Sequence, residues 1–149
     1  MKIERFEDTK AWQEARALVN IIYDAVESNK GFTGDYKFRE QIQGAAVSVM
    51  SNIAEGFSRR STKEFVQFLF IAKGSAAEVQ SQLYVALDQG YINEEKFNEL
   101  YTKSDEVARL ISGFIRYLLN KDKPQTLERP NKLSEPKQLN KPKKLRELQ

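Results

Sequence analysis

Polar and charged side chains gather in one short stretch of the chain, SNIAEGFSRRSTKEF, residues 51–65. It contains an amide and a carboxylate, Asn52 and Glu55, followed by three cations, Arg59, Arg60 and Lys63. Such a set could perform acid–base chemistry through the carboxylate, bind an anion through the cations, or cap and join two helices. The residue types present elsewhere in the chain limit the first of these uses.

The chain contains no histidine and no cysteine. It therefore lacks a Ser-His-Asp triad, a thiol nucleophile, a disulfide, a zinc–thiolate site and any side chain that titrates near neutral pH without a perturbed environment. Inward carboxylates such as Glu55 and Glu78 could hold a metal, but di-iron bundles complete that site with Glu-x-x-His pairs. We expect no catalytic residue, no metal, no cofactor and no small-molecule substrate.

Five polar residues occupy positions on two predicted helices at which side chains could meet between the helices. Satisfied together, they would fix the register of the two helices, whereas a half-satisfied set would be costly. We interpret them as a structural polar network in preference to a catalytic site. They are Gln41, Asn52, Glu55, Ser75 and Glu78.

The three cations lie at the corner between the same two helices. Because a helix N-terminus favours anions, Ser61 with Arg59, Arg60 and Lys63 could hold a phosphate. In the alternative, Arg59 and Arg60 neutralise Glu55 and complement the C-terminal end of the preceding helix. Both alternatives remain open at this point.

Four segments repeat their apolar residues with the 3.6-residue period of an amphipathic helix. They run from about residue 8 to 26, 36 to 56, 61 to 87 and 93 to 118. The connections are short, SNKGFTGD reads as a glycine-containing loop, and no strand pattern competes. This arrangement predicts an all-α protein, an antiparallel up-down-up-down four-helix bundle.

Local signals mark where these helices begin and end. Ser61 and Glu64 predict a capping box at the start of the third helix, and Asn93 a cap on the fourth. Gly56 and Gly90 are expected to end the second and third helices. The third helix is apolar around most of its circumference in the run FVQFLFI, residues 65–71, which indicates burial on more than one side and hence self-association.

The composition changes abruptly after Asn120. All four prolines lie beyond it and every aromatic residue lies before it, which predicts a bundle in residues 1–120 and an extended or disordered tail in residues 121–149. The tail repeats a Leu-x-x-Pro-x-x unit. It carries nine basic and four acidic residues against 15 and 17 in the rest of the chain, so the net charge of +3 comes from the tail.

Three interpretations of the tail are open. It is a solvated, basic, disordered segment, or a polyproline II ribbon that docks on the bundle or a neighbouring subunit, or a set of phosphate contacts. The candidate phosphate contacts are Lys137, Lys141, Lys143, Lys144 and Arg146. The chain shows neither a membrane-spanning run nor the apolar segment of a signal peptide, so we expect a cytoplasmic protein without a membrane partner.

Three motifs carry a family likeness: FEDTKAWQEA, SVMSNIAEGFSRRSTKEF, and FLFIAKGSAAEV followed by LDQGYI. Together they resemble the four-helix-bundle proteins encoded in intervening sequences of 23S rRNA genes, to which accessory proteins of diversity-generating retroelements are similar. The resemblance covers roughly residues 6 to 120. It implies a noncatalytic bundle that assembles as a ring, typically a homopentamer, with RNA or a nucleoprotein as the suggested partner, and it supplies no catalytic residues.

One departure from the family pattern bears on that partner. The family often carries arginines shortly after the glutamine that matches Gln41, where this chain has IQGAA. We therefore expect any RNA contact to come from the basic corner and the tail. The alternative is a structural homo-oligomeric scaffold or interaction module whose tail docks on a neighbouring subunit or partner.

Overall fold

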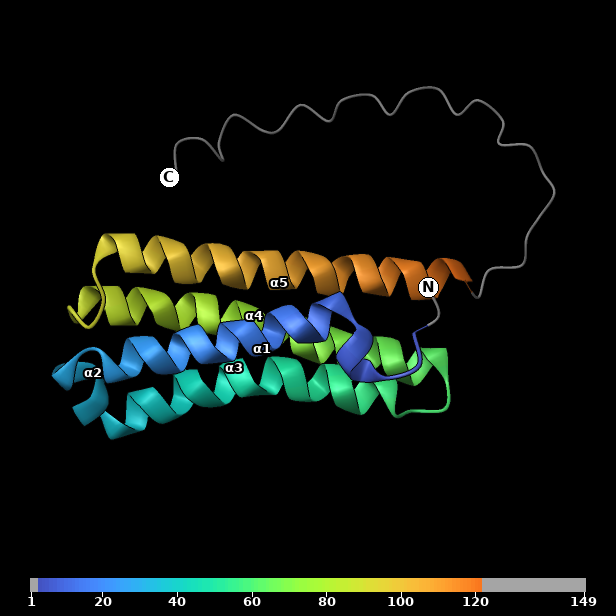
Figure 1. Cartoon of the computed structure of the whole chain (residues 1–149), viewed down its shortest axis with the longest axis horizontal. Coiled ribbons are helices and arrows are strands. Elements are labelled where there is room, and N and C mark those ends of the chain that lie inside the picture. The colour runs from blue at the N-terminus through green and yellow to red at the C-terminus, as the bar shows by residue number, and fades with distance from the viewer. Residues whose placement is uncertain (1–2, 122–149) are drawn as a thin grey trace, which may run out of the picture.

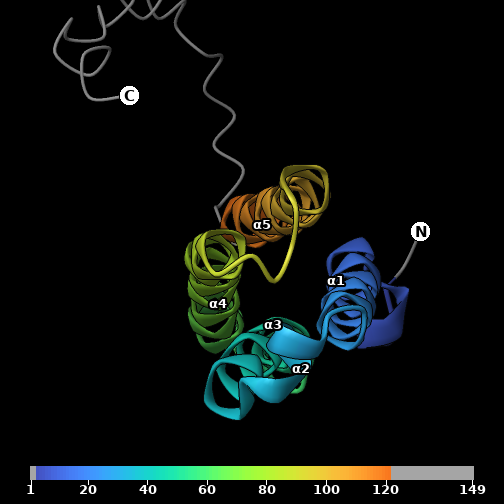
Figure 2. The same cartoon turned by 90° about the vertical axis from the view of Figure 1, so that its left-hand side faces the viewer.

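The computed structural model describes residues 3–121, which form helices and no strand. The elements are the 3-10 turn η1 (Phe6–Asp8) and the helices α1 (Lys10–Glu27), α2 (Lys30–Gly34), α3 (Tyr36–Phe57), α4 (Thr62–Asp88) and α5 (Glu94–Lys121). The four long helices run antiparallel along one axis (Figure 1). Viewed from one end, they occupy the corners of a bundle in which α1 lies diagonally opposite α4 (Figure 2).

This architecture confirms the predicted all-α bundle for the described residues. Three connections join the four long helices: the α3–α4 corner lies at the end where α1 and α4 begin and α3 and α5 finish, and the other two lie at the opposite end. The predicted tail lies outside the described residues, except for Lys121. Among residues 3–121, no helix has both the length and the apolar character needed to cross a membrane.

A polar side chain caps the N-terminus of each α-helix, as short side-chain acceptors do in general. The acceptors are Thr9, Asn29, Asp35, Ser61 and Asn93. Asn93 confirms its predicted role, with its Oδ1 accepting from the Lys96 amide at 2.8 Å. The capping box is only half formed: Ser61 Oγ accepts from the Glu64 amide at 3.2 Å, and the described hydrogen bonds include no return bond to the Ser61 amide.

The two glycines that were expected to end helices behave differently. Gly90 has φ = 72°, and the amides of Gly90 and Tyr91 donate to the carbonyls of Leu87 and Ala86 at 3.0 and 2.9 Å, which is a Schellman motif. Gly56 was expected to release the chain, but α3 continues through it to Phe57 and its φ is not positive.

Gly56 instead permits the close approach of α3 to α4. It is buried, and a Cβ placed on it would lie 2.7 Å from Phe65 Cδ2 and 2.8 Å from Phe68 Cβ. Real Cβ atoms essentially never come that close to another heavy atom. The glycine is therefore required by packing between helices and not by backbone conformation.

The segment predicted as a loop, SNKGFTGD, contains the short helix α2. Its Phe32 is buried and stacks on Phe38 and Tyr91, with ring centroids 5.6 and 5.2 Å away. The Tyr91 hydroxyl donates to Asp35 Oδ2 at 2.7 Å, and this hydrogen bond raises the pKa of Tyr91. These contacts close the end of the bundle at which α2 lies.

The core is built from the predicted apolar stripes of the four long helices. Buried alanines on α1, α3 and α4 let neighbouring backbones approach, and larger side chains fill the space between them. The largest fully buried members in the long helices include Leu18, Ile22, Ile42, Ile53, Leu69, Leu83, Leu100 and Ile111.

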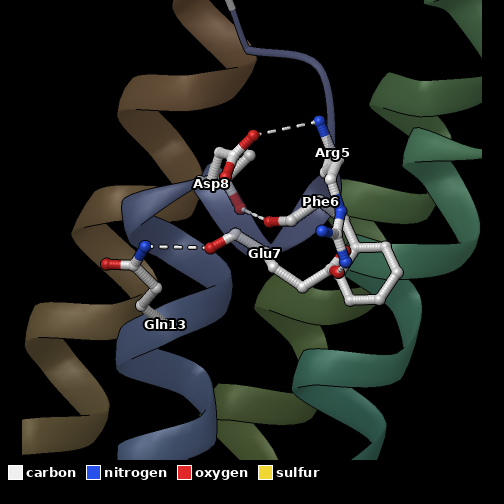
Figure 3. A network of polar contacts seen from close by, with 6 residues as sticks. Arg5, Phe6, Glu7, Asp8 and Gln13 are labelled. Carbon is white, nitrogen blue, oxygen red and sulfur yellow. Dashed lines mark hydrogen bonds and ion pairs between the residues drawn. The ribbon is translucent and has the colours of Figure 1, made fainter.

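A turn of polar contacts fixes the chain in front of α1 (Figure 3). The Arg5 amide donates to Asp8 Oδ2 at 3.2 Å, and Gln13 Nε2 donates to the Glu7 carbonyl at 2.9 Å. The ring of Phe6 packs edge-on against Trp12, with centroids 5.1 Å apart. This turn places the N-terminal segment at the end of the bundle where α5 finishes.

An ion pair joins α1 to α5. Lys103 Nζ donates to Glu14 Oε2, and Lys10 Nζ lies 3.2 Å from Glu14 Oε1. The hydrogen bond from Lys103 lowers the pKa of Glu14, and the same bond raises the pKa of Lys103. Both shifts favour the charged forms in the folded chain, so the ion pair stabilises the folded state relative to the unfolded state.

Substituting Glu14→Gln should lower the free energy of unfolding by about 1 kcal/mol at neutral pH, a typical value for a partly exposed ion pair. Because the pKa of Glu14 is lowered on folding, its contribution is present above the ordinary carboxyl pKa and is lost as the pH falls through the lowered one. The stabilities of the two proteins, measured by denaturant titration, should therefore converge progressively as the pH falls below the ordinary carboxyl pKa of about 4.3.

A matched variant checks the specificity of that result. Glu40 is exposed and forms no ion pair with another described residue, so Glu40→Gln should leave stability nearly unchanged at every pH. A Glu14→Gln effect that stays constant between pH 7 and pH 2 would contradict the ion-pair explanation.

Candidate functional site

The three cations of the basic corner have different surroundings. Arg59 Nη2 lies 2.6 Å from Glu55 Oε1, and its guanidinium lies 4.7 Å from the centroid of the Phe68 ring. Arg59 thus neutralises Glu55, as one of the two alternatives for the corner predicted, and it covers an aromatic ring at the α3–α4 junction. Its side chain is committed to contacts within the fold.

Arg60 and Lys63 remain available at the same corner. Both are exposed, and neither forms an ion pair with another residue of the described part of the chain. Arg60 directly precedes the N-cap Ser61 and Lys63 lies in the first turn of α4, where the helix dipole favours negative charge. The expectation that Arg60 also neutralises Glu55 does not match this arrangement, because Arg59 alone lies one helical turn beyond Glu55.

A pocket of about 370 Å³ lies beside Arg60, and we refer to it as the end pocket. Its walls include four aromatic rings in succession, with centroids 5.8, 5.2 and 6.4 Å apart. Its charged groups include Arg59, Arg60 and Lys121, the last residue of α5. The rings belong to Phe57, Phe65, Phe114 and Tyr117.

The predicted five-residue polar network is not formed. Asn52 and Ser75 are joined through Ser48: the hydroxyls of Ser48 and Ser75 lie 3.0 Å apart, and Asn52 Nδ2 donates to Ser48 Oγ at 3.0 Å and to its carbonyl at 2.8 Å. This smaller cluster links α3 to α4. Glu55 is not part of it, since its carboxylate faces Arg59.

The other two members of the predicted network lie apart from this cluster. Gln41 is exposed on α3, and no described hydrogen bond joins its side chain to the cluster. Glu78 is exposed and accepts from Gln82 Nε2 at 3.3 Å, within its own helix. Both side chains point to the outer surface, where water can solvate them at no cost, so neither needs a partner between the helices. Within residues 3–121, no acidic cluster is suited to hold a metal ion.

The outward surface of α4 is unusually apolar. Phe70 and Ile71 are 54% and 51% exposed, and Val85 is 43% exposed. Gly74 and Ser81 lie on the same side of the helix, and a Cβ added to Gly74 would meet nothing within 4 Å. We call this surface the outer face of α4, and it is made of Phe70, Ile71, Gly74, Ala77, Glu78, Ser81 and Val85.

The remaining predicted site residues, Lys137, Lys141, Lys143, Lys144 and Arg146, lie outside the described residues. Two segments that are distant in the sequence, the α3–α4 corner and the end of α5, line the same pocket in the structure. Sequence reasoning missed three residues that line this pocket: Phe114, Tyr117 and Lys121. The periodic pattern of a helix does not show which of its residues will line a pocket formed with other helices.

Comparisons with known proteins agree with this fold. A family model described as 23S rRNA-intervening sequence protein matches residues 7–113. Among solved structures, the chain is similar to a protein described as of unknown function from the S23 ribosomal protein family of Bacteroides thetaiotaomicron VPI-5482, with 24% identity and a TM-score of 0.60. That match covers 72% of this chain and 95% of the other. No curated protein matches.

Proposed function

Because the chain belongs to the 23S rRNA-intervening sequence protein family, we propose that it is a noncatalytic bundle that assembles with copies of itself and presents its basic corner to RNA. The outer face of α4 is the observation that supports assembly most strongly. It lies on the long helix whose residues 65–71 are apolar around most of the circumference, and the other described helices leave it uncovered.

The composition of this face suits contact with another protein surface. Removing exposed Phe, Ile and Val side chains from water is favourable by about 25 cal/mol for each Å² of apolar area that is buried. Between Phe65 and Leu87, α4 carries only two charged residues, Lys73 and Glu78. A surface with so few charges resembles the desolvated centre of an interface.

Gly74 adds a second argument for assembly. A glycine within a helix costs roughly 0.5–1 kcal/mol relative to alanine. Nothing among residues 3–121 requires it, since an added Cβ would meet no atom of that part of the chain within 4 Å. A helix or loop of a second copy that approaches α4 closely would require it, because a small residue allows two backbones to come together.

Assembly through two different surfaces of each copy closes into a ring when the rotation between neighbours permits it. The ring that we propose has five copies, as the family resemblance implies. Each copy has a mass of 17.2 kDa. The outer face of α4 is then one half of each interface, and a second surface of the neighbouring copy covers it.

RNA is the partner that we propose for the basic corner. Arg60 and Lys63 support it, because they are the exposed cations of the corner that no described carboxylate neutralises. Cations that neutralise phosphates release counterions, so affinity should fall steeply as salt is raised. Binding that is weak and insensitive to salt would favour the alternative of a structural scaffold.

A single cysteine tests which surface assembly covers, since the natural chain has none. Ser81→Cys places a thiol on the outer face of α4 with little change in size. We expect its rate of labelling by a maleimide dye to fall several-fold as protein concentration rises and copies assemble. Asn20→Cys, on the exposed side of α1, serves as the control and should label at one rate throughout.

The comparison of the two cysteines also shows how the proposal would fail. If Ser81→Cys labels as fast as Asn20→Cys at every concentration, the outer face of α4 is not the surface that copies cover.

A further inference from the structure

The end pocket combines aromatic walls with a cationic rim. Phe57 packs edge-on against Phe65, which packs edge-on against Phe114, and Tyr117 follows at the mouth. Core packing accounts for the first three rings, which are partly buried. Tyr117 differs because it is 56% exposed, so the other described residues leave much of its ring accessible.

Cationic side chains line the same pocket as that exposed ring. Arg60 comes from the α3–α4 corner and Lys121 from the end of α5, and both line the same pocket as Tyr117. Neither forms an ion pair with another described residue. Thr62 begins α4 at the pocket wall, so the positive end of that helix dipole adds to the same field.

Aromatic rings beside cations recognise unpaired nucleotides. A base stacks on an aromatic side chain, and the adjoining phosphates bind to arginine and lysine. The volume of about 370 Å³ suits one small group and lies near the lower end of the range of ligand pockets. A base within an A-form duplex is already stacked on both faces, so it cannot offer a free face to Tyr117.

We propose that the end pocket seats one unpaired base of a single-stranded RNA against Tyr117, while Arg60 and Lys121 hold the neighbouring phosphates. This inference rests on the proposed binding of RNA and names the form of RNA that the site accepts. It also gives Arg60 a role that Arg59, which is paired with Glu55, does not share.

The test uses the full chain and a single-stranded RNA of about ten nucleotides that contains one 2-aminopurine, with its duplex form as a comparison. We expect the protein to quench the 2-aminopurine in the single strand and to bind the duplex several-fold more weakly. Tyr117→Ala should weaken single-strand binding roughly tenfold, which is within the range for loss of one stacked base, and should leave the salt dependence unchanged.

Two further variants separate stacking from charge. Arg60→Gln should weaken binding and flatten the salt slope by about one phosphate contact. Tyr36→Ala is the matched control, because Tyr36 is also an exposed tyrosine beside an arginine, Arg39, whose guanidinium lies 4.7 Å from its ring centroid, but at the opposite end of the bundle. It should change neither affinity nor quenching.

The outcomes distinguish this inference from the function on which it rests. Absence of any RNA binding by the folded protein overturns both. Salt-dependent RNA binding that Tyr117→Ala leaves intact, or that is equally strong for the duplex, overturns the end pocket as the base site and leaves RNA binding in place.

Discussion

Gly56→Ala is expected to lower the free energy of unfolding by about 1–3 kcal/mol, the usual cost of adding a methyl group to a closely packed site. The added Cβ would lie 2.8 Å from Phe68 Cβ, an atom held near the backbone of α4 that cannot rotate away. The helices must therefore separate, and Gly56→Val should cost more. Thermal and denaturant unfolding followed by circular dichroism would measure the loss.

Gly113→Ala is the matched control for Gly56→Ala. Gly113 lies within α5, and a Cβ added there would meet only Arg116 Nη2, at an ordinary contact distance of 3.9 Å. This variant should be stabilised by roughly 0.5–1 kcal/mol, because alanine favours the helix. Equal effects of the two substitutions would show that close approach at Gly56 does not limit stability.

Phe70→Glu is expected to convert the assembly into single subunits of 17.2 kDa. Phe70 is 54% exposed within the subunit, so a glutamate there can be solvated and the bundle should fold. At an interface between copies the same carboxylate would be buried without a partner, which costs several kcal/mol for each ion. Sedimentation velocity would give the mass, and circular dichroism would confirm the helices.

Tyr36→Glu provides the comparison for Phe70→Glu. Tyr36 is even more exposed, at 67%, and lies at the first position of α3, away from the outer face of α4. This variant should keep the mass of the unmodified protein. If both variants keep that mass, the outer face of α4 does not form the interface.

The long helices of the described residues could be predicted because each carries its information locally. Apolar periodicity and caps such as Asn93 depend on residues within one or two turns. Gly90 was predictable for the same reason, since a positive φ at a helix end is a property of that residue alone. Helix α2 was missed because it depends on Phe32, a single apolar residue whose partners, Phe38 and Tyr91, lie elsewhere in the chain.

The candidate site was less predictable because it depends on how the helices are rotated against each other. The sequence indicated a cationic corner but could not tell that Arg59 would pair with Glu55 and leave Arg60 exposed. Ser48 was not among the predicted network residues, because only the packing of α4 on α3 shows that Ser75 lies beside it. The end pocket joins α3, α4 and α5, so no local pattern could reveal it.

The mass of the unmodified chain, measured by native mass spectrometry over a range of concentrations, tests self-assembly most directly. We expect a defined multiple of 17.2 kDa, and a closed ring of five copies would give about 86 kDa. A single species of 17.2 kDa at all concentrations up to those used for structural work would contradict the proposed assembly.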